Sequence, residues 1–181
     1  MPAFQPVTTP RLLLRRPVAA DAEAIFSRYA SDPELTRYMA WPRHRTLDDT
    51  REFIAFSDEA WQTWPAGPLL IERREDHLLL GGTGFGFNAP DSANTGYILA
   101  RDAAGHGYAT EAITAIVSLA WRFGIRRLDA ICYASHQPSI HVLEKCGFLR
   151  EELLRNAISF PNLAPGFHDA VVYSIVPAPL N

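Results

Sequence analysis

The stretch ILARDAAGHGYATEA at residues 98–112 decides the fold that this chain is expected to take. Its apolar beginning is typical of the end of a strand, and a glycine-containing loop then leads directly into a helical pattern. Gly105 and Gly107 have no Cβ, so the loop can adopt backbone angles that other residues avoid. Because the first N–H groups of a helix lack internal partners and carry partial positive charge, the stretch predicts an anion-binding loop.

The residues after this loop predict a helix and then another strand. Apolar side chains recur at the spacing of one helical face, at Ala109, Ala112, Ile113, Ile116, Val117 and Ala120. Residues 128–134, LDAICYA, then alternate as a strand does. Strand, loop, helix and strand therefore form a βαβ unit, whose two strands run parallel.

Two other interpretations of the loop are open at this point. The pattern G-x-G alone often marks only a tight turn. A dinucleotide-binding Rossmann motif would have a third glycine where Thr110 stands. It would also have an acidic residue at the end of the following strand, whereas Asp129 lies at the start of that strand.

Composition favours a single soluble domain spanning residues 1–181. Apolar residues make up 48% of the chain and charged residues 20%, which excludes disordered and fibrous classes. A net charge of −3 argues against a nucleic-acid-binding protein. Because no apolar run reaches the roughly 20 residues of a membrane helix and no secretory signal begins the chain, we expect no membrane association and a cytoplasmic protein.

Cysteine and histidine usage predicts neither a disulfide nor a metal site. Cys132 and Cys146 lie in different predicted elements, and the six histidines are scattered along the chain. The aromatic residues Trp41, Phe53, Trp61 and Trp64 are interpreted as core packing or, alternatively, as the wall of a substrate cleft.

The remaining pattern completes an α+β order of elements. Strands are expected at residues 11–16, 69–74, 78–87, 95–101, 128–134, 149–155 and 168–176. Thr46 and Asp49 form a capping box at the start of one helix. The run GGTGFGF at residues 81–87 leads into a polar loop rather than a helix, so we interpret it as a strand with a bulge.

Four segments resemble the GNAT superfamily of acetyl-CoA-dependent N-acetyltransferases, in its RimJ/RimL branch. They are TPRLLLRRPVAADAEAIF at residues 9–26, SDPELTRYMAWP at 31–42, GYILARDAAGHGYATEA at 96–112 and QPSIHVLEKCGF at 137–148. The resemblance implies a mixed, mostly antiparallel seven-stranded sheet flanked by helices. This sheet is splayed between its fourth and fifth strands, and the pantetheine arm of acetyl-CoA lies in the split.

Carried over to this chain, the resemblance assigns the donor site residue by residue. Leu99, Ala100 and Arg101 would pair with the pantetheine, and the diphosphate would be held by main-chain N–H groups of Gly105, His106, Gly107, Tyr108, Ala109 and Thr110. Ser139 would offer its hydroxyl to the departing thiolate, although a serine beside Pro138 is equally suited to cap a helix. Glu111 is expected to face away from the phosphates, because its charge would repel them.

This chain departs from the family pattern at positions that matter for proton transfer. His136 stands where the family usually has an asparagine that contacts the pantetheine, and Asn94 stands where many members have a glutamate. An amide cannot accept a proton from an amine, and residues 156–159, NAIS, offer no carboxylate either. The possible bases are Glu72, His136, His168, Asp169 and a chain of water molecules.

The expected function is acetyl transfer from acetyl-CoA to a primary amine, without a metal. A site that lacks a dedicated base favours a weakly basic acceptor, such as the α-amine of a protein or peptide (pKa ~7.8), over a lysine-type amine (pKa ~10.4). Three alternatives are open: a non-catalytic acyl-CoA-binding or regulatory protein, an acetyltransferase of small amines such as amino acids, polyamines or antibiotics, and a nicotinamide-dependent redox enzyme. The resemblance also allows a homodimer.

Overall fold

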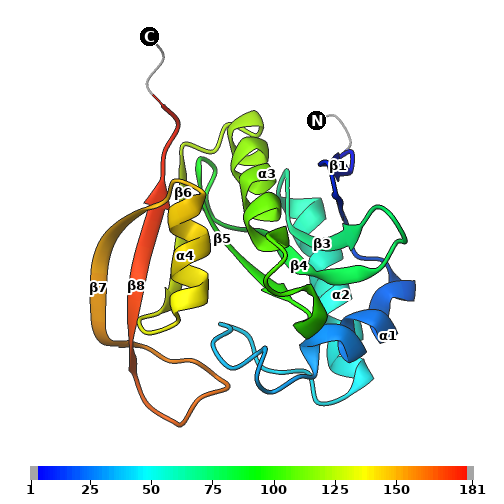
Figure 1. The fold of residues 1–181 in the computed structure, drawn as a ribbon, viewed down its shortest axis with the longest axis horizontal. Coiled ribbons are helices and arrows are strands. Elements are labelled where there is room, and N and C mark those ends of the chain that lie inside the picture. The colour runs from blue at the N-terminus through cyan, green and yellow to red at the C-terminus, as the bar shows by residue number, and fades with distance from the viewer. Residues whose placement is uncertain (1–3, 179–181) are drawn as a thin grey trace.

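A mixed sheet of eight strands forms the centre of the molecule, whose computed structural model describes residues 4–178 (Figure 1). The strand order is β1-β2-β3-β4-β5-β6-β8-β7, and all neighbours are antiparallel except β5 and β6. The strands are β1 (Val7–Thr8), β2 (Leu12–Arg15), β3 (Pro68–Arg73), β4 (Leu79–Ala89), β5 (Ser92–Leu99), β6 (Arg127–Tyr133), β7 (Leu149–Ile158) and β8 (His168–Ile175). The expected α+β class is confirmed.

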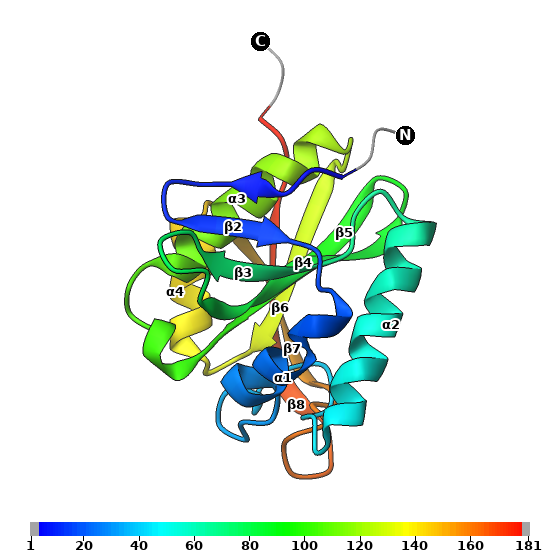
Figure 2. The ribbon, with the colours of Figure 1, turned by 90° about the vertical axis from the view of Figure 1, so that its right-hand side faces the viewer.

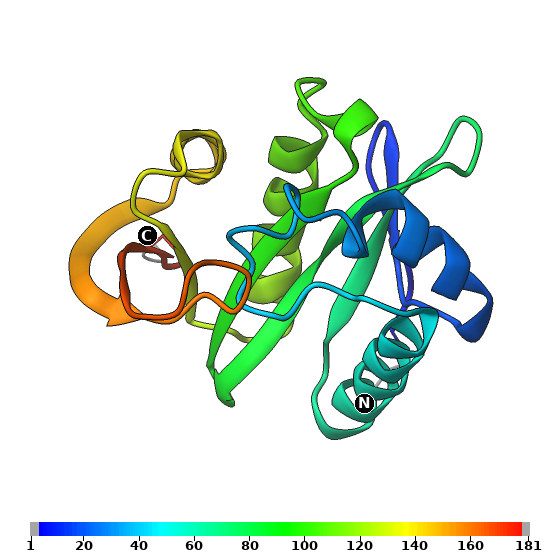
Figure 3. The ribbon, with the colours of Figure 1, turned by 90° about the horizontal axis from the view of Figure 1, so that it is seen from below.

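Helices cover both faces of this sheet (Figures 2 and 3). They are α1 (Ala22–Ile25), its continuation as a π-helical turn (Phe26–Ala30), α2 (Leu47–Thr63), α3 (Tyr108–Arg122) and α4 (Gln137–Lys145). On one face, helices α1 and α2 pack on Leu70, Leu79 and Ile98. On the opposite face, α3 and α4 belong to the larger hydrophobic core. Within residues 4–178, no helix has the length and apolar character to cross a membrane.

Helix starts follow the sequence patterns closely. Thr46 and Asp49 form the expected capping box at the start of α2, with the Thr46 N–H donating to the Asp49 carboxylate over 2.9 Å. The apolar stripe of α3 is buried against the sheet at Ala112, Ile113 and Ile116, each 0% exposed. Helix α3 is therefore fixed by its packing on the sheet, and its N-terminus is held beside the end of β5.

Two expectations about the strands are wrong. The sheet has eight strands rather than seven, because Val7 and Thr8 pair with Leu14 and Leu13 as a short edge strand that has too few residues to show alternation. The strand before the loop begins at Ser92 rather than at residue 95, and within the polar stretch at residues 88–94 only Pro90 and Asp91 form the hairpin turn. In this stretch Ala93 is buried between the half-buried Ser92 and the exposed Asn94, so the alternation typical of a strand was present among residue types that favour turns.

The aromatic residues near α2 pack in separate places rather than around one cleft. Trp61 donates its indole N–H to the Pro68 oxygen over 2.9 Å, and Trp64 stacks on Phe87 with ring centroids 4.9 Å apart. Trp41 packs instead against His44. The core-packing interpretation therefore describes these side chains better than a shared substrate wall.

The sheet opens between β5 and β6. These parallel strands pair only at Ser92 with Arg127, Ala93 with Leu128, and Asn94 with Asp129. Beyond these pairs, β5 stays paired with β4 and β6 with β8, so the two strands diverge toward their carboxyl ends. The resemblance predicted this split between the fourth and fifth strands of the family sheet. The extra edge strand β1 shifts the numbering by one, so these two strands are β5 and β6 here.

Candidate active site

The loop that joins β5 to α3 presents a row of free backbone donors. Gly105 and Gly107 both have left-handed backbone angles (φ 79° and 78°), and Gly107 is the N-cap of α3. Among residues 4–178, no group accepts a hydrogen bond from the backbone N–H of residues 105–110. With the positive end of the helix dipole behind them, these N–H groups can hold an anion.

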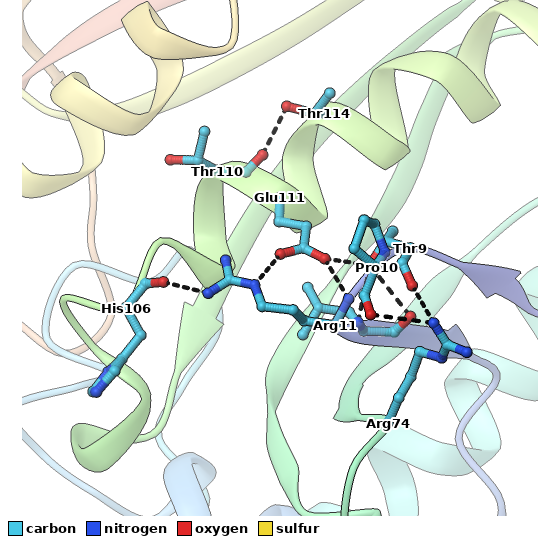
Figure 4. A network of polar contacts seen from close by, with 9 residues as sticks. Thr9, Pro10, Arg11, Arg74, His106, Thr110, Glu111 and Thr114 are labelled. Atoms are coloured by element: carbon cyan, nitrogen blue, oxygen red, sulfur yellow. Dashed lines mark hydrogen bonds and ion pairs between the residues drawn. The ribbon is translucent and has the colours of Figure 1, made fainter.

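Glu111, in the first turn of α3, points to the turn between β1 and β2 (Figure 4). Its carboxylate accepts hydrogen bonds from the Thr9 hydroxyl (2.6 Å) and from Arg11 Nε (2.6 Å). Burial opposes its ionisation, but these hydrogen bonds outweigh it and lower the pKa of Glu111 below its ordinary value. The charge that would repel a phosphate is thus paired with Arg11.

Arg11 also contacts the loop itself, which the sequence did not indicate. Its Nη1 donates to the His106 oxygen over 2.8 Å, and its guanidinium carbon lies 4.6 Å from the centroid of the Tyr108 ring. Arg11 therefore contacts residues on both sides of Gly107, and Figure 4 shows its contact with His106. Its position in TPRLLLRR gave no local signal, because its partners lie about a hundred residues later.

The end of β5 offers an open edge toward the split, with one exception. Residues 95–99 of β5 pair with β4 on one side, and β6 has already diverged on the other. Ala100, however, donates its N–H to the Leu80 oxygen over 2.8 Å, so this donor is already used within the sheet. The pairing of Leu99, Ala100 and Arg101 with a pantetheine arm stays a prediction, in which the N–H of Ala100 takes no part.

The side chain of Arg101 is held by the loop before α2. Its Nε and Nη2 each donate to the Asp32 carboxylate over 2.6 Å. These hydrogen bonds lower the pKa of Asp32. Any contact of Arg101 with a ligand in the split would use its backbone.

Across the split, α4 begins with His136 and Ser139. His136 is the N-cap and Ser139 the third residue of the helix, so the alternative that Ser139 caps α4 is wrong. Burial lowers the pKa of His136, which keeps its ring neutral near pH 7. This ring packs on Tyr38, with centroids 4.8 Å apart.

Tyr97 is a functional candidate that sequence reasoning missed. It lies on β5 where the strand borders the split, and it packs against the core on the side of α3 and α4. Burial raises the pKa of Tyr97 to about 12, an effect that the neighbouring Ser139 opposes. The phenol is therefore protonated and close to the Ser139 hydroxyl. Strand alternation in the sequence places Tyr97 on the same face as Leu99, and this pattern could have identified Tyr97 as a candidate site residue.

Glu72, one of the possible bases, lies in a separate cluster. It is 6% exposed on β3, and β4 and β5 intervene between β3 and β6. Its carboxylate oxygens accept from Arg15 Nε (2.6 Å) and contact His77 Nδ1 (2.7 Å). Burial favours the neutral form, but these partners prevail and lower the pKa of Glu72, which makes it a weak base. The structure does not bring Glu72 beside Ser139.

His168 and Asp169 lie at the start of β8 near the end of β6. Asp169 accepts a hydrogen bond from the Asn156 N–H over 2.8 Å, and His168 Nε2 lies 3.0 Å from the Ala164 oxygen. A cavity of about 460 Å³ is lined by Tyr133, Ala134, Ser135, Asn156, Phe167, His168 and Asp169. Ser135, which lines this cavity, directly precedes His136 in the chain. Residues 4–178 contain no group of three or more His, Cys, Asp or Glu side chains that could hold a metal ion.

Comparisons with known proteins agree with this arrangement. The family model of the acetyltransferase (GNAT) domain matches residues 11–149. The chain is 32% identical over 176 residues to the uncharacterized N-acetyltransferase YoaA of Bacillus subtilis, covering 96% of this chain and 97% of that protein.

Solved structures show the same fold. An acetyltransferase of the GNAT family from Bacillus anthracis superposes with a TM-score of 0.83 at 25% identity, covering 95% of this chain and 98% of its own. The ribosomal alpha-N-protein acetyltransferase RimL in complex with coenzyme A reaches 0.84 at 20% identity, with the same coverage. The chain belongs to the GNAT acetyltransferase family and is an N-acetyltransferase.

Proposed function

We propose that this N-acetyltransferase takes its acetyl group from acetyl-CoA and transfers it to a weakly basic primary amine. The observation that carries the proposal is the row of N–H groups at residues 105–110, which no residue between 4 and 178 engages. Main-chain donors at a helix N-terminus suit the diphosphate of a coenzyme A ester. RimL, which shares the fold, was solved with coenzyme A.

The reaction needs a neutral amine, a leaving thiolate and a path for protons. The amine nitrogen bonds to the thioester carbon, the carbon–sulfur bond breaks, and the thiolate takes up a proton. Ser139 supplies that proton in this proposal. The protonated phenol of Tyr97, which lies beside Ser139, can then return a proton to the serine. The amine proton passes to His136, whose neutral ring can accept it, or to water.

The acceptor class follows from the weakness of the available bases. At pH 7.5 an α-amine with a pKa of ~7.8 is roughly one-third neutral, whereas a lysine-type amine is neutral about once in a thousand molecules. With no carboxylate at Asn94 and with Glu72 held by Arg15, the site favours the α-amine. The proposed acceptor is a peptide or protein N-terminus.

One experiment tests both the proposed donor and the proposed acceptor class. Release of free coenzyme A is followed with a thiol reagent while the protein is mixed with acetyl-CoA and one of four amines: an unblocked peptide, the same peptide with an acetylated N-terminus, a blocked peptide carrying one lysine, and spermidine. We expect saturable release with the unblocked peptide and none with its acetylated control. Acetyl-CoA binding by calorimetry without turnover of the unblocked peptide would refute the proposed acceptor, and absence of binding would refute the proposed donor.

A further inference from the structure

A loop crosses the mouth of the split between β5 and β6. We call this loop, residues 31–46, the strap. On the β5 side Asp32 accepts two hydrogen bonds from Arg101, each 2.6 Å long, directly after β5 ends. On the β6 side Tyr38 stacks on Tyr133, with ring centroids 4.6 Å apart and planes 18° from parallel. The strap therefore joins the two strands that diverge.

Tyr38 also connects the strap to the start of α4. Its ring centroid lies 4.8 Å from that of His136, three residues before Ser139. A displacement of the strap would therefore also change the positions of His136 and Ser139, the side chains proposed to transfer protons.

The third anchor of the strap comes from the connection between β7 and β8. Asn162 Nδ2 donates to the Thr36 oxygen (2.8 Å) and to the Trp41 oxygen (2.9 Å), and Asn162 Oδ1 accepts from the Arg43 N–H (2.8 Å). Both amide hydrogens and the amide oxygen are used. These bonds link residues that are 119–126 positions apart, so they depend on the complete fold.

The strap has little regular structure of its own to hold it. Between residues 37 and 43, the backbone N–H groups with partners are those of Met39, bonded to Thr36, and Arg43, bonded to Asn162. The connection that carries Asn162 is itself anchored, because Phe160 is 4% exposed and packs edge-on against Tyr133 at 5.6 Å. Figure 3 shows the strap and this connection side by side.

We propose that Asn162 is a positioning residue that fixes the strap against the β7–β8 connection and thereby forms the wall of the acceptor site. The inference rests on the proposed acetyl transfer and adds the element that selects the amine. The cavity lined by Tyr133, His168 and Asp169 lies at the same end of β6 as the strap anchor. The donor loop is held separately by Arg11, so loss of Asn162 affects the acceptor and spares the donor.

The test compares Asn162→Ala, Asn162→Asp and the control Gln62→Ala, which removes an exposed amide from α2. The aspartate keeps the acceptor for Arg43 but sets an oxygen against the carbonyls of Thr36 and Trp41. Backbone amide exchange over residues 36–43 reports on the strap without any substrate. Steady-state kinetics use the best amine of the four-member panel, and calorimetry gives the Kd of acetyl-CoA.

For both Asn162 variants we expect at least tenfold faster exchange over residues 36–43 and at least a tenfold rise in the KM for the amine. The Kd of acetyl-CoA should stay within twofold of the wild type, as should every readout of Gln62→Ala. Unchanged exchange would show that Asn162 does not hold the strap, and faster exchange with an unchanged KM would refute the acceptor role. Absence of turnover by the wild-type protein refutes the proposed function instead, and the exchange data then still decide whether Asn162 anchors the strap.

Discussion

Arg11 Nε lies 2.6 Å from the Glu111 carboxylate and so ties the turn before β2 to the first turn of α3, across 100 positions of sequence. The same guanidinium reaches the His106 oxygen within the loop. The conformation of the proposed diphosphate-binding loop therefore depends on a segment that lies about a hundred residues earlier in the sequence.

The Arg11→Ala substitution should weaken acetyl-CoA binding. It removes the hydrogen bonds from the side chain to Glu111 and His106 and leaves the Glu111 carboxylate, 15% exposed, without its cation. Arg11 is about half exposed, so we expect a loss of only about 1 kcal/mol, or roughly fivefold in Kd. Calorimetry measures this, with Arg51→Ala, an exposed arginine on α2, as the control. An unchanged Kd would mean that the loop keeps its shape without Arg11.

Gly107→Ala should reduce both stability and acetyl-CoA affinity. An alanine with left-handed backbone angles costs roughly 1–2 kcal/mol, and relief of that strain would rotate the donors of the loop. Gly124→Ala is a matched control, because Gly124 has the same φ of 78° with open space around it at the end of α3. Both variants should unfold at similarly lowered temperatures, but only Gly107→Ala should bind acetyl-CoA more weakly. Equal affinities in the two variants would contradict the assignment of the loop.

Ser139→Ala should lower kcat on the order of 100-fold, while the Kd of acetyl-CoA changes less than threefold. The reason is that the hydroxyl would act on the departing thiolate rather than on the bound ester. Tyr97→Phe should show a smaller loss of kcat, because it removes the phenol that is proposed to return a proton to Ser139. Ser118→Ala on the exposed side of α3 is the control. A full rate for Ser139→Ala would exclude Ser139 as the acid.

Glu72→Gln should change stability rather than the pH dependence of the reaction. The pKa of Glu72 is lower in the folded protein than its ordinary value of 4.5, because Arg15 and His77 stabilise the carboxylate against burial. Its contribution to stability is therefore complete above pH 4.5 and is lost as the pH falls through the lower, folded value. At pH 7 the variant should be less stable by about 2 kcal/mol, and chemical denaturation should show this difference shrinking below pH 4. A shifted pH–rate profile in Glu72→Gln would instead restore Glu72 as the base.

The sequence predicted the parts of the molecule that are encoded locally. The loop at residues 98–112, the buried face of α3 and the capping box at Thr46 each depend on residues within a few turns of one another. Arg11, Tyr97 and Asn162 were missed because their roles arise from contacts across the sheet or between distant loops. Glu72 was misjudged for the same reason, since its partner Arg15 is 57 positions away.

The short pairing of β5 with β6 has a thermodynamic consequence. Five strands on one side and three on the other share a seam of three residue pairs, so the sheet is close to two separate sheets. An extended ligand arm between them would supply hydrogen-bond partners along the stretch where β5 and β6 do not pair. Saturation with such a ligand at 100 times its Kd adds about 2.7 kcal/mol to the free energy of unfolding, so the donor substrate would also act as a structural component that joins the two halves.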